Sequence, residues 1–289
     1  MSFVTIDRDK CTLCGDCVDT CLFCFSEKDG EIIVDANEDN CLHCGHCVSI
    51  CPADAVTHQR LNMETFSELS RPAVIDTETF VQFIKERRSH RRYDAKTILP
   101  AHFETLIEVC RFSATGDNLQ GVQILVLQDK ARIEKISGMV LDHIARITKR
   151  VEVKISELPA DRSSLSEEDK FMLHQYQLSS ALIKGGKEGR ETIFWGAPAV
   201  MIFHAHSKLG TPKDDCVIAA QTVVLTARTM GLESCYCGAL QITSQYNQPV
   251  MDELMLPPEH KVFSVLALGY PEQTYLKTVD RRPMKVRWE

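Results

Sequence analysis

CTLCGDCVDTC at residues 11–21 and CLHCGHCVSIC at residues 41–51 are two copies of one cysteine spacing. Three cysteines at intervals of three residues, followed by a fourth, are the ligand pattern of a 4Fe–4S cluster. Where two such runs occur together, the fourth cysteine of each run binds the cluster of the other run. The spacing therefore predicts two clusters with crossed ligand sets: Cys11, Cys14, Cys17 and Cys51 in the first, and Cys41, Cys44, Cys47 and Cys21 in the second.

Disulfides or zinc are the alternative uses for the 13 cysteines of this 289-residue chain. The chain opens MSFVTIDRDK, without the apolar run of a secretory signal, so we expect a cytoplasmic protein whose thiols bind metal or act in catalysis. Zinc sites draw their ligands from two pairs, which does not explain a triplet followed by a fourth cysteine. Clusters are therefore the preferred interpretation. Cys24 lies outside the pattern and is expected to pack as a small apolar residue.

The two runs also form an internal repeat, because a shift of 30 residues (41 − 11) superimposes their cysteines and glycines. Short segments that favour β-structure, residues 3–6 and 31–35, precede the runs. This pattern resembles the bacterial two-cluster ferredoxins over residues 1–58. One departure is that Pro52 follows Cys51, whereas Leu22 follows Cys21. Because proline lacks an N–H, we expect the two turns to hydrogen-bond their sulfurs differently.

Charge divides the chain into an acidic N-terminal part and a neutral remainder. Residues 1–60 hold eleven acidic and four basic side chains, a net charge of −7 (4 − 11), which equals that of the whole chain. An acidic surface suits a basic partner and argues against nucleic acid. No run of about 20 apolar residues exists, so we expect no membrane span. We predict a two-cluster domain at 1–60, a linker at 61–73 and a second domain at 74–289.

The second domain alternates amphipathic helices with a few apolar strands. Helices are expected after Thr77, after Pro100 and over residues 214–231, with Gly231 as the C-terminal cap. Strands are expected at residues 122–128, 199–204 and 263–269. Helical sequence between the first two strands is interrupted at residues 157–166. The predicted class is α+β.

Five short motifs follow one another through this domain. RRSHRRYD at 87–94 offers guanidinium groups suited to phosphate, and TGDNLQ at 115–120 offers two amide side chains. GLESCYCG at 231–238, GYP at 269–271 and RRP at 281–283 complete the series. In this order over residues 74–289, the motifs resemble the nitroreductase family of FMN enzymes. The resemblance implies an α+β homodimer that binds FMN at the subunit interface and reacts by alternate reduction and oxidation.

The resemblance also implies roles for individual residues. Arg87, Ser89 and Arg91 match residues around the FMN phosphate, Arg281 matches a later phosphate contact, and Asn118 matches the amide that faces the isoalloxazine. Gln120 belongs to the same loop, and Tyr236, Cys237, Gly238 and Ala239 match backbone near flavin N5. Two positions stay open, since Arg88 can contribute through its backbone alone and Arg282 can replace Arg281. The loop lacks both prolines that the family prefers around Asn118, which leaves the loop less rigid.

Together these parts predict an FMN-dependent, nitroreductase-like oxidoreductase. A low-potential donor, either a ferredoxin-like protein or NAD(P)H, supplies single electrons through the clusters to FMN. FMN then reduces an electron-poor small molecule, such as a nitroaromatic, a quinone or an activated alkene. No side chain is assigned a catalytic role. The alternatives are an electron-transfer or redox-sensing flavoprotein without small-molecule turnover, and a flavin-dependent dehydrogenase or dehalogenase.

Overall fold

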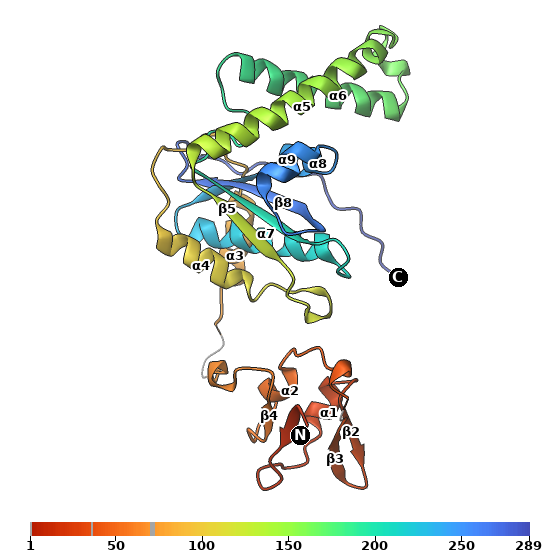
Figure 1. The fold of residues 1–289 in the computed structure, drawn as a ribbon, viewed down its shortest axis with the longest axis vertical. Coiled ribbons are helices and arrows are strands. Elements are labelled where there is room, and N and C mark those ends of the chain that lie inside the picture. The colour runs from red at the N-terminus through yellow and green to blue at the C-terminus, as the bar shows by residue number, and fades with distance from the viewer. Residues whose placement is uncertain (1, 36, 70–72) are drawn as a thin grey trace. The chain divides into compact units, whose positions relative to one another are not determined.

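The computed structural model describes residues 2–35, 37–69 and 73–289 (Figure 1). It divides into two compact units, the first comprising the residues up to Ile75 together with Asp117–Leu119 and the second comprising Asp76–Gly116 and Gln120–Glu289. Each unit is described by its own elements. In the described ranges, no helix is both long enough and apolar enough to cross a membrane.

The first unit is a small α+β domain built from two two-stranded sheets. Its strands are β1 (Val4–Ile6), β2 (Phe25–Lys28), β3 (Glu31–Val34) and β4 (Val56–His58), and its helices are α1 (Asp16–Thr20), α2 (His46–Ser49) and the 3-10 turns Glu38–Asn40 and Met63–Thr65. Strands β1 and β3 confirm the two strands expected ahead of the cysteine runs. Strand β1 pairs with β4, and β2 pairs with β3, both antiparallel. The first and last strands of the unit therefore lie together.

Left-handed backbone conformations recur at matching positions of the two halves. Leu13 and His43 have φ values of 57° and 49°, and Gly15 and Gly45 have values of 81° and 73°. The two glycines cap α1 and α2 at their N-termini. Glycine adopts this conformation without the steric cost of a Cβ, which explains its place inside each run. The Asp29–Gly30 turn, with both φ positive, joins β2 to β3 in the manner of a tight two-residue hairpin.

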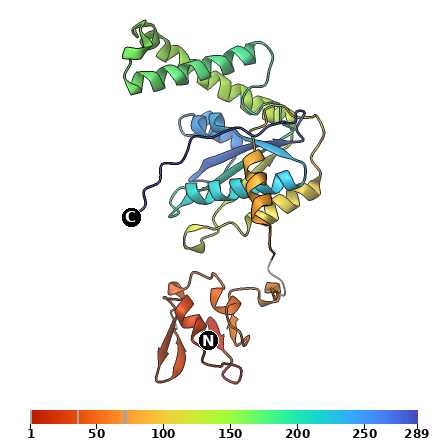
Figure 2. The same cartoon turned by 180° about the vertical axis from the view of Figure 1, so that it is seen from behind.

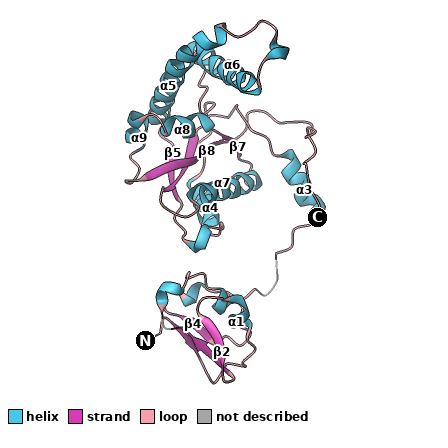
Figure 3. Cartoon of the chain, turned by 90° about the vertical axis from the view of Figure 1, so that its right-hand side faces the viewer, coloured by secondary structure: helices cyan, strands magenta, loops and turns pink. Residues whose placement is uncertain are grey.

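The second unit is a four-stranded antiparallel sheet with helices on both faces (Figure 3). Its sheet order is β5–β6–β8–β7, formed by β5 (Gln123–Leu127), β6 (Ala199–His206), β7 (Glu233–Tyr236) and β8 (His260–Gly269). Its helices are α3 (Thr77–Glu86), α4 (Pro100–Cys110), α5 (Lys130–Ser156), α6 (Glu167–Lys187), α7 (Pro212–Thr229), α8 (Gly238–Ser244) and α9 (Gln248–Leu254), with 3-10 turns at Gly116–Asn118 and Arg162–Ser164.

Three of these strands were expected, and the fourth was not. The predicted strands 122–128, 199–204 and 263–269 correspond to β5, β6 and β8, the last beginning three residues earlier than expected. The segment Glu233–Tyr236, for which the sequence predicts no strand, is β7, the edge strand beside β8. Four residues that include Glu233 and Ser234 carry too weak an apolar alternation to predict a strand.

Both faces of the sheet are buried, which explains why β6 and β8 are apolar almost throughout. On β6, Met201 and Phe203 pack into one core cluster, while Val200 and Ile202 pack into the other. Helices α4 and α7 lie over the first of these faces, and α5, α8 and α9 lie over the second (Figures 1 and 2). A strand covered on both faces has no polar side to alternate with, as the sequence shows. The fold class is α+β, as predicted.

The turn that leads into β6 depends on one carboxylate. Glu191 accepts hydrogen bonds from the backbone N–H groups of Ile193 at 2.9 Å, Phe194 at 2.9 Å and Gly196 at 2.8 Å. The Ser137 hydroxyl of α5 donates a further hydrogen bond to it. These donors satisfy backbone groups in a turn where Trp195, a residue with a Cβ, has a φ of 63°.

We therefore expect Glu191→Gln to destabilise the second unit. An amide presents one oxygen instead of two and turns an NH₂ toward N–H donors, so the expected loss is about 2–4 kcal/mol of the free energy of unfolding. Urea unfolding followed by tryptophan fluorescence measures it. Glu188→Gln is the matched control, because Glu188 makes only exposed ion pairs with Lys184 and Arg190. Equal losses in the two variants would contradict the assignment.

Candidate functional site

The first unit gathers four cysteines around one small cavity. Cys11, Cys14 and Cys17 of the first run and Cys51 of the second run line it, together with the apolar side chains of Ile6, Ile32 and Val56. This is the first crossed set that the spacing predicts. The charge-bearing groups of the cavity are these thiols and Asp16, so a cofactor held there is held by sulfur.

The second crossed set converges around Cys47. Burial, with smaller contributions from the neighbouring sulfurs of Cys21, Cys44 and Cys41, raises the pKa of the Cys47 thiol to about 11. Four thiolates at such close quarters repel one another unless a cationic group lies among them. The donor set therefore fits a metal cluster, whose binding drives the thiols to release their protons. With both sets formed, the residues present fit two 4Fe–4S clusters.

Cys24 is a ninth cysteine in this unit but belongs to neither set. It is 2% exposed and packs in the apolar core with Phe3 and Ile32. Burial raises the pKa of its thiol to about 12, and the adjacent Cys41 and Cys21 add to the shift. A neutral, buried thiol agrees with the packing role expected for Cys24.

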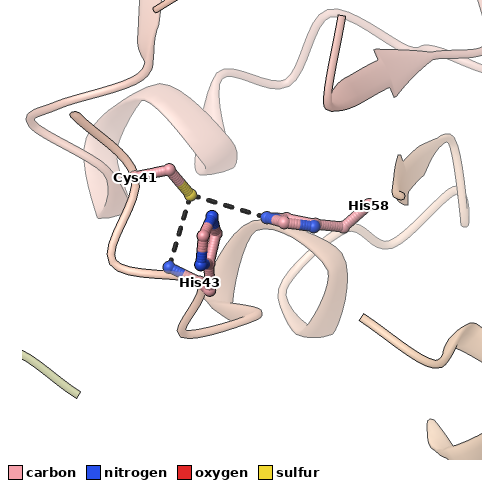
Figure 4. Close-up of side chains that lie close together, drawn as sticks. All are labelled: Cys41, His43 and His58. Carbon is pink, nitrogen blue, oxygen red and sulfur yellow. Dashed lines mark hydrogen bonds between the residues drawn. The ribbon is translucent and has the colours of Figure 1, made fainter. Parts of the chain in front are cut away.

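A histidine that the sequence did not single out lies against the second set (Figure 4). The Nε2 atom of His58 is 3.5 Å from the Sγ atom of Cys41, and the backbone N–H of His43 donates to the same sulfur at 3.4 Å. Burial, and then the nearby His43, lowers the pKa of His58, so the ring is neutral. The ligand atoms of Cys41, His43 and His58 all lie within 4.8 Å of one another.

In the second unit, the predicted phosphate segment lies along β7. Arg87 ends α3, and the chain then runs extended, with the N–H of His90 donating to the carbonyl oxygen of Ser234 at 3.1 Å. His90 is buried, and its Nδ1 atom is 3.4 Å from a Glu233 carboxylate oxygen. Arg228 of α7 is 3.0 Å from the other oxygen of Glu233. This network fixes the backbone that carries the arginines.

The side chains of that segment meet the residues of the β7–α8 corner. A hydrogen bond with Cys237 lowers the pKa of Cys235 to about 7 against the opposing effect of burial, and the charge of Arg91 and a hydrogen bond with Ser89 lower it further. Burial raises the pKa of Tyr236 to about 12, while the charge of Arg87 opposes the rise. Arg87 therefore lies beside Tyr236, and Ser89 and Arg91 lie beside Cys235, with Cys237, Gly238 and Ala239 following along the chain. Guanidinium groups and a hydroxyl at one corner suit a phosphate.

Aromatic side chains that the sequence did not reveal surround this corner. The guanidinium of Arg91 lies 5.3 Å from the centre of the Trp195 ring, and that of Arg88 lies 5.9 Å from the Tyr275 ring. The Tyr275 hydroxyl donates to the carbonyl oxygen of Ser89 at 3.2 Å. Neither aromatic residue stands in a motif, so no sequence pattern indicates these contacts.

The remaining predicted flavin residues lie elsewhere in the chain. Asn118 and Gln120, with φ values of 53° and 49°, stand in the loop between α4 and β5. Arg281 is exposed in the C-terminal segment, where its backbone N–H bonds to its neighbour Asp280. No hydrogen bond or ion pair among the described residues joins any of the three to Arg87, Ser89 or Arg91.

Comparisons with known proteins agree with the division into two kinds of domain. Residues 84–270 match the nitroreductase family, and residues 3–52 match the 4Fe-4S dicluster domain. A nitroreductase with bound FMN from Bacteroides fragilis is 20% identical with a TM-score of 0.53, over 72% of this chain and 98% of that one. A nitroreductase with bound FMN from Desulfitobacterium hafniense is 18% identical with a TM-score of 0.52, and the match covers 74% of this chain and 100% of that one. The search of curated proteins finds no match.

Paired cysteine substitutions distinguish crossed from uncrossed sets. Cys11→Ala with Cys51→Ala removes two ligands of one crossed set, so about four of about eight irons are expected to remain. Cys11→Ala with Cys21→Ala removes one ligand from each crossed set, so both clusters are expected to be lost. Iron and sulfide per chain, measured after anaerobic purification, give the answer. Uncrossed sets would reverse the two results, and Cys24→Ala is the control that keeps all the iron.

Proposed function

This chain belongs to the nitroreductase family, and on that premise we propose that it is an iron–sulfur flavoprotein that reduces electron-poor small molecules. Two 4Fe–4S clusters receive single electrons from a low-potential donor, and FMN in the second unit passes them on in pairs. The observation that carries the proposal is the convergence of two crossed four-cysteine sets in a chain whose larger domain has the nitroreductase fold. The FMN of the Bacteroides and Desulfitobacterium proteins supports the choice of flavin.

The cofactors supply complementary chemistry, since clusters exchange one electron at a time and FMN stores two and releases a hydride equivalent. The chain's own contribution is to bind and orient. Arg87 and Arg91 attract the flavin phosphate, and Ser89 adds a hydroxyl donor beside them. The backbone of Tyr236–Ala239 lies next to these groups and borders the ring. Because the flavin carries the reacting atom, no side chain acts as a nucleophile.

A second copy of the chain completes the flavin site in this proposal. Asn118, Gln120 and Arg281 have no bond to the Arg87–Arg91 segment within the part of one chain that the structure describes, so we infer that they serve the partner's flavin. Large apolar side chains on the second unit support a homodimer. Phe171 is 65% exposed, Leu276 89% and Trp288 90%, which is unfavourable without a partner surface.

Rapid mixing tests the proposed activity. Protein reduced anaerobically with dithionite and freed of excess reductant is mixed with a nitrofuran or with menadione, and the flavin absorbance is followed. We expect reoxidation much faster than in buffer alone. Reoxidation at the rate of the buffer control, in protein loaded with iron and FMN, would favour electron relay or sensing over small-molecule reduction. Zinc in place of iron would refute the proposal from its start.

Arg91 is expected to contribute to FMN affinity through its charge. Arg91→Ala removes a charge-assisted bond to phosphate, which corresponds to about 1.5–3 kcal/mol and a dissociation constant at least about tenfold higher. Quenching of FMN fluorescence on titration with flavin-free protein measures it. Arg92→Ala is the matched control, since Arg92 forms an exposed pair with Glu272. An unchanged affinity in Arg91→Ala, or an equal loss in both variants, would count against the phosphate assignment.

A further inference from the structure

We propose that His58 raises the reduction potential of the cluster held by Cys21, Cys41, Cys44 and Cys47, so that this cluster is reduced before the other. The inference rests on the proposed pair of clusters and adds an order to them. It assigns His58 a positioning role, acting on the cluster through the ligand sulfur of Cys41.

The direction of the hydrogen bond follows from the other side of the ring. The backbone N–H of Arg60 donates to the Nδ1 atom of His58 at 3.2 Å, so Nδ1 carries the lone pair. In a neutral imidazole the proton then sits on Nε2. Nε2 is the atom 3.5 Å from the Sγ atom of Cys41, so His58 donates to the sulfur. His58 is 1% exposed, and water therefore does not compete for this bond.

A donor at a ligand sulfur favours the reduced cluster. Reduction adds one electron, and the added negative charge spreads onto the ligand sulfurs. A hydrogen bond to such a sulfur stabilises that charge and raises the potential. The effect is larger in a buried site, where the effective dielectric constant is low.

The first set lacks this donor. Backbone N–H groups donate to sulfurs of both sets, among them Ala55 to Cys51 at 3.3 Å and His43 to Cys41 at 3.4 Å. The repeat places Lys28 where the second half has His58 (58 − 30), and Lys28 is exposed at the end of β2. Among the described residues, no side chain donates a hydrogen bond to a sulfur of the first set.

One charge difference between the two halves of the repeat acts in the same direction. Asp16 lines the cavity of the first set, and the repeat places His46 at the matching position of the second half (46 − 30). A carboxylate beside a cluster disfavours the addition of an electron, whereas a histidine side chain carries no negative charge. Two independent differences between the halves thus make the second cluster the easier one to reduce.

Redox titration of the full-length, cluster-loaded protein, followed by electron paramagnetic resonance, tests the order. We expect two separate one-electron steps. His58→Phe keeps an aromatic ring at this position but removes the donor. We expect it to lower the potential of the higher step by about 59 mV, which is about tenfold in the equilibrium constant for reduction, and to leave the potential of the lower step unchanged. His58→Gln keeps an N–H at the position of Nε2 and is expected to retain most of the higher potential. His43→Leu is the control, because Leu13 occupies the matching left-handed position and the backbone donor remains.

Each outcome decides the matter. A single potential for both clusters, an unchanged titration in His58→Phe, or a shift of the lower step would overturn the inference while leaving the proposed function intact. If the His58→Phe variant loses one cluster, we expect the remaining cluster to titrate at the lower of the two wild-type potentials. Titration of the remaining cluster at the higher potential would overturn the inference. A protein without clusters, shown by its iron content, would overturn both proposals.

Discussion

The structure of the first unit depends on the exchange of one cysteine between its two halves. Cys51 of the second run lies with Cys11, Cys14 and Cys17, and Cys21 of the first run lies near Cys47. This arrangement accompanies the pairing of β1 with β4, which brings the two ends of the unit together. In so small a domain the apolar core is limited, so metal binding and folding are expected to be linked. In the predicted crossed arrangement, each ligand set takes cysteines from both halves.

In the second unit, a partly buried network of side chains around Glu233 holds the elements together. Glu233 lies between the side chains of Arg228 and His90. Arg228 also donates to the carbonyl oxygen of Phe83, and the backbone N–H of His90 donates to the carbonyl oxygen of Ser234. This network of side chains connects α3, α7, the Arg87–Arg91 segment and β7. Breaking a buried ion pair leaves an uncompensated charge, so these residues hold the Arg87–Arg91 segment in one conformation. In the proposed function, the residues that bind the flavin phosphate are thus positioned by groups that do not touch it.

Features that follow from regular spacing in the sequence could be predicted, whereas contacts made by single side chains could not. The cysteine sets, the three apolar strands and the Gly231 cap all follow from patterns that repeat or alternate along the chain. Strand β7 escaped prediction because it is short and half polar, and its pairing with β8 comes from the fold around it. His58 and Tyr275 escaped because a single side chain says nothing about which partner the fold brings to it. Asn118 and Gln120 come from motifs whose role, in the proposed homodimer, depends on a second copy of the chain.

The pairing of β1 with β4 also has a consequence for how the chain is made. Val4 pairs with His58, so the first strand must wait while 54 further residues (58 − 4) leave the ribosome. The hairpin of β2 and β3, closed by the tight Asp29–Gly30 turn, forms much earlier because its partners are adjacent. The first unit therefore matures from its middle outward. Until β4 emerges, β1 presents an unpaired edge, and the nascent chain is most exposed to wrong pairing at its own N-terminus.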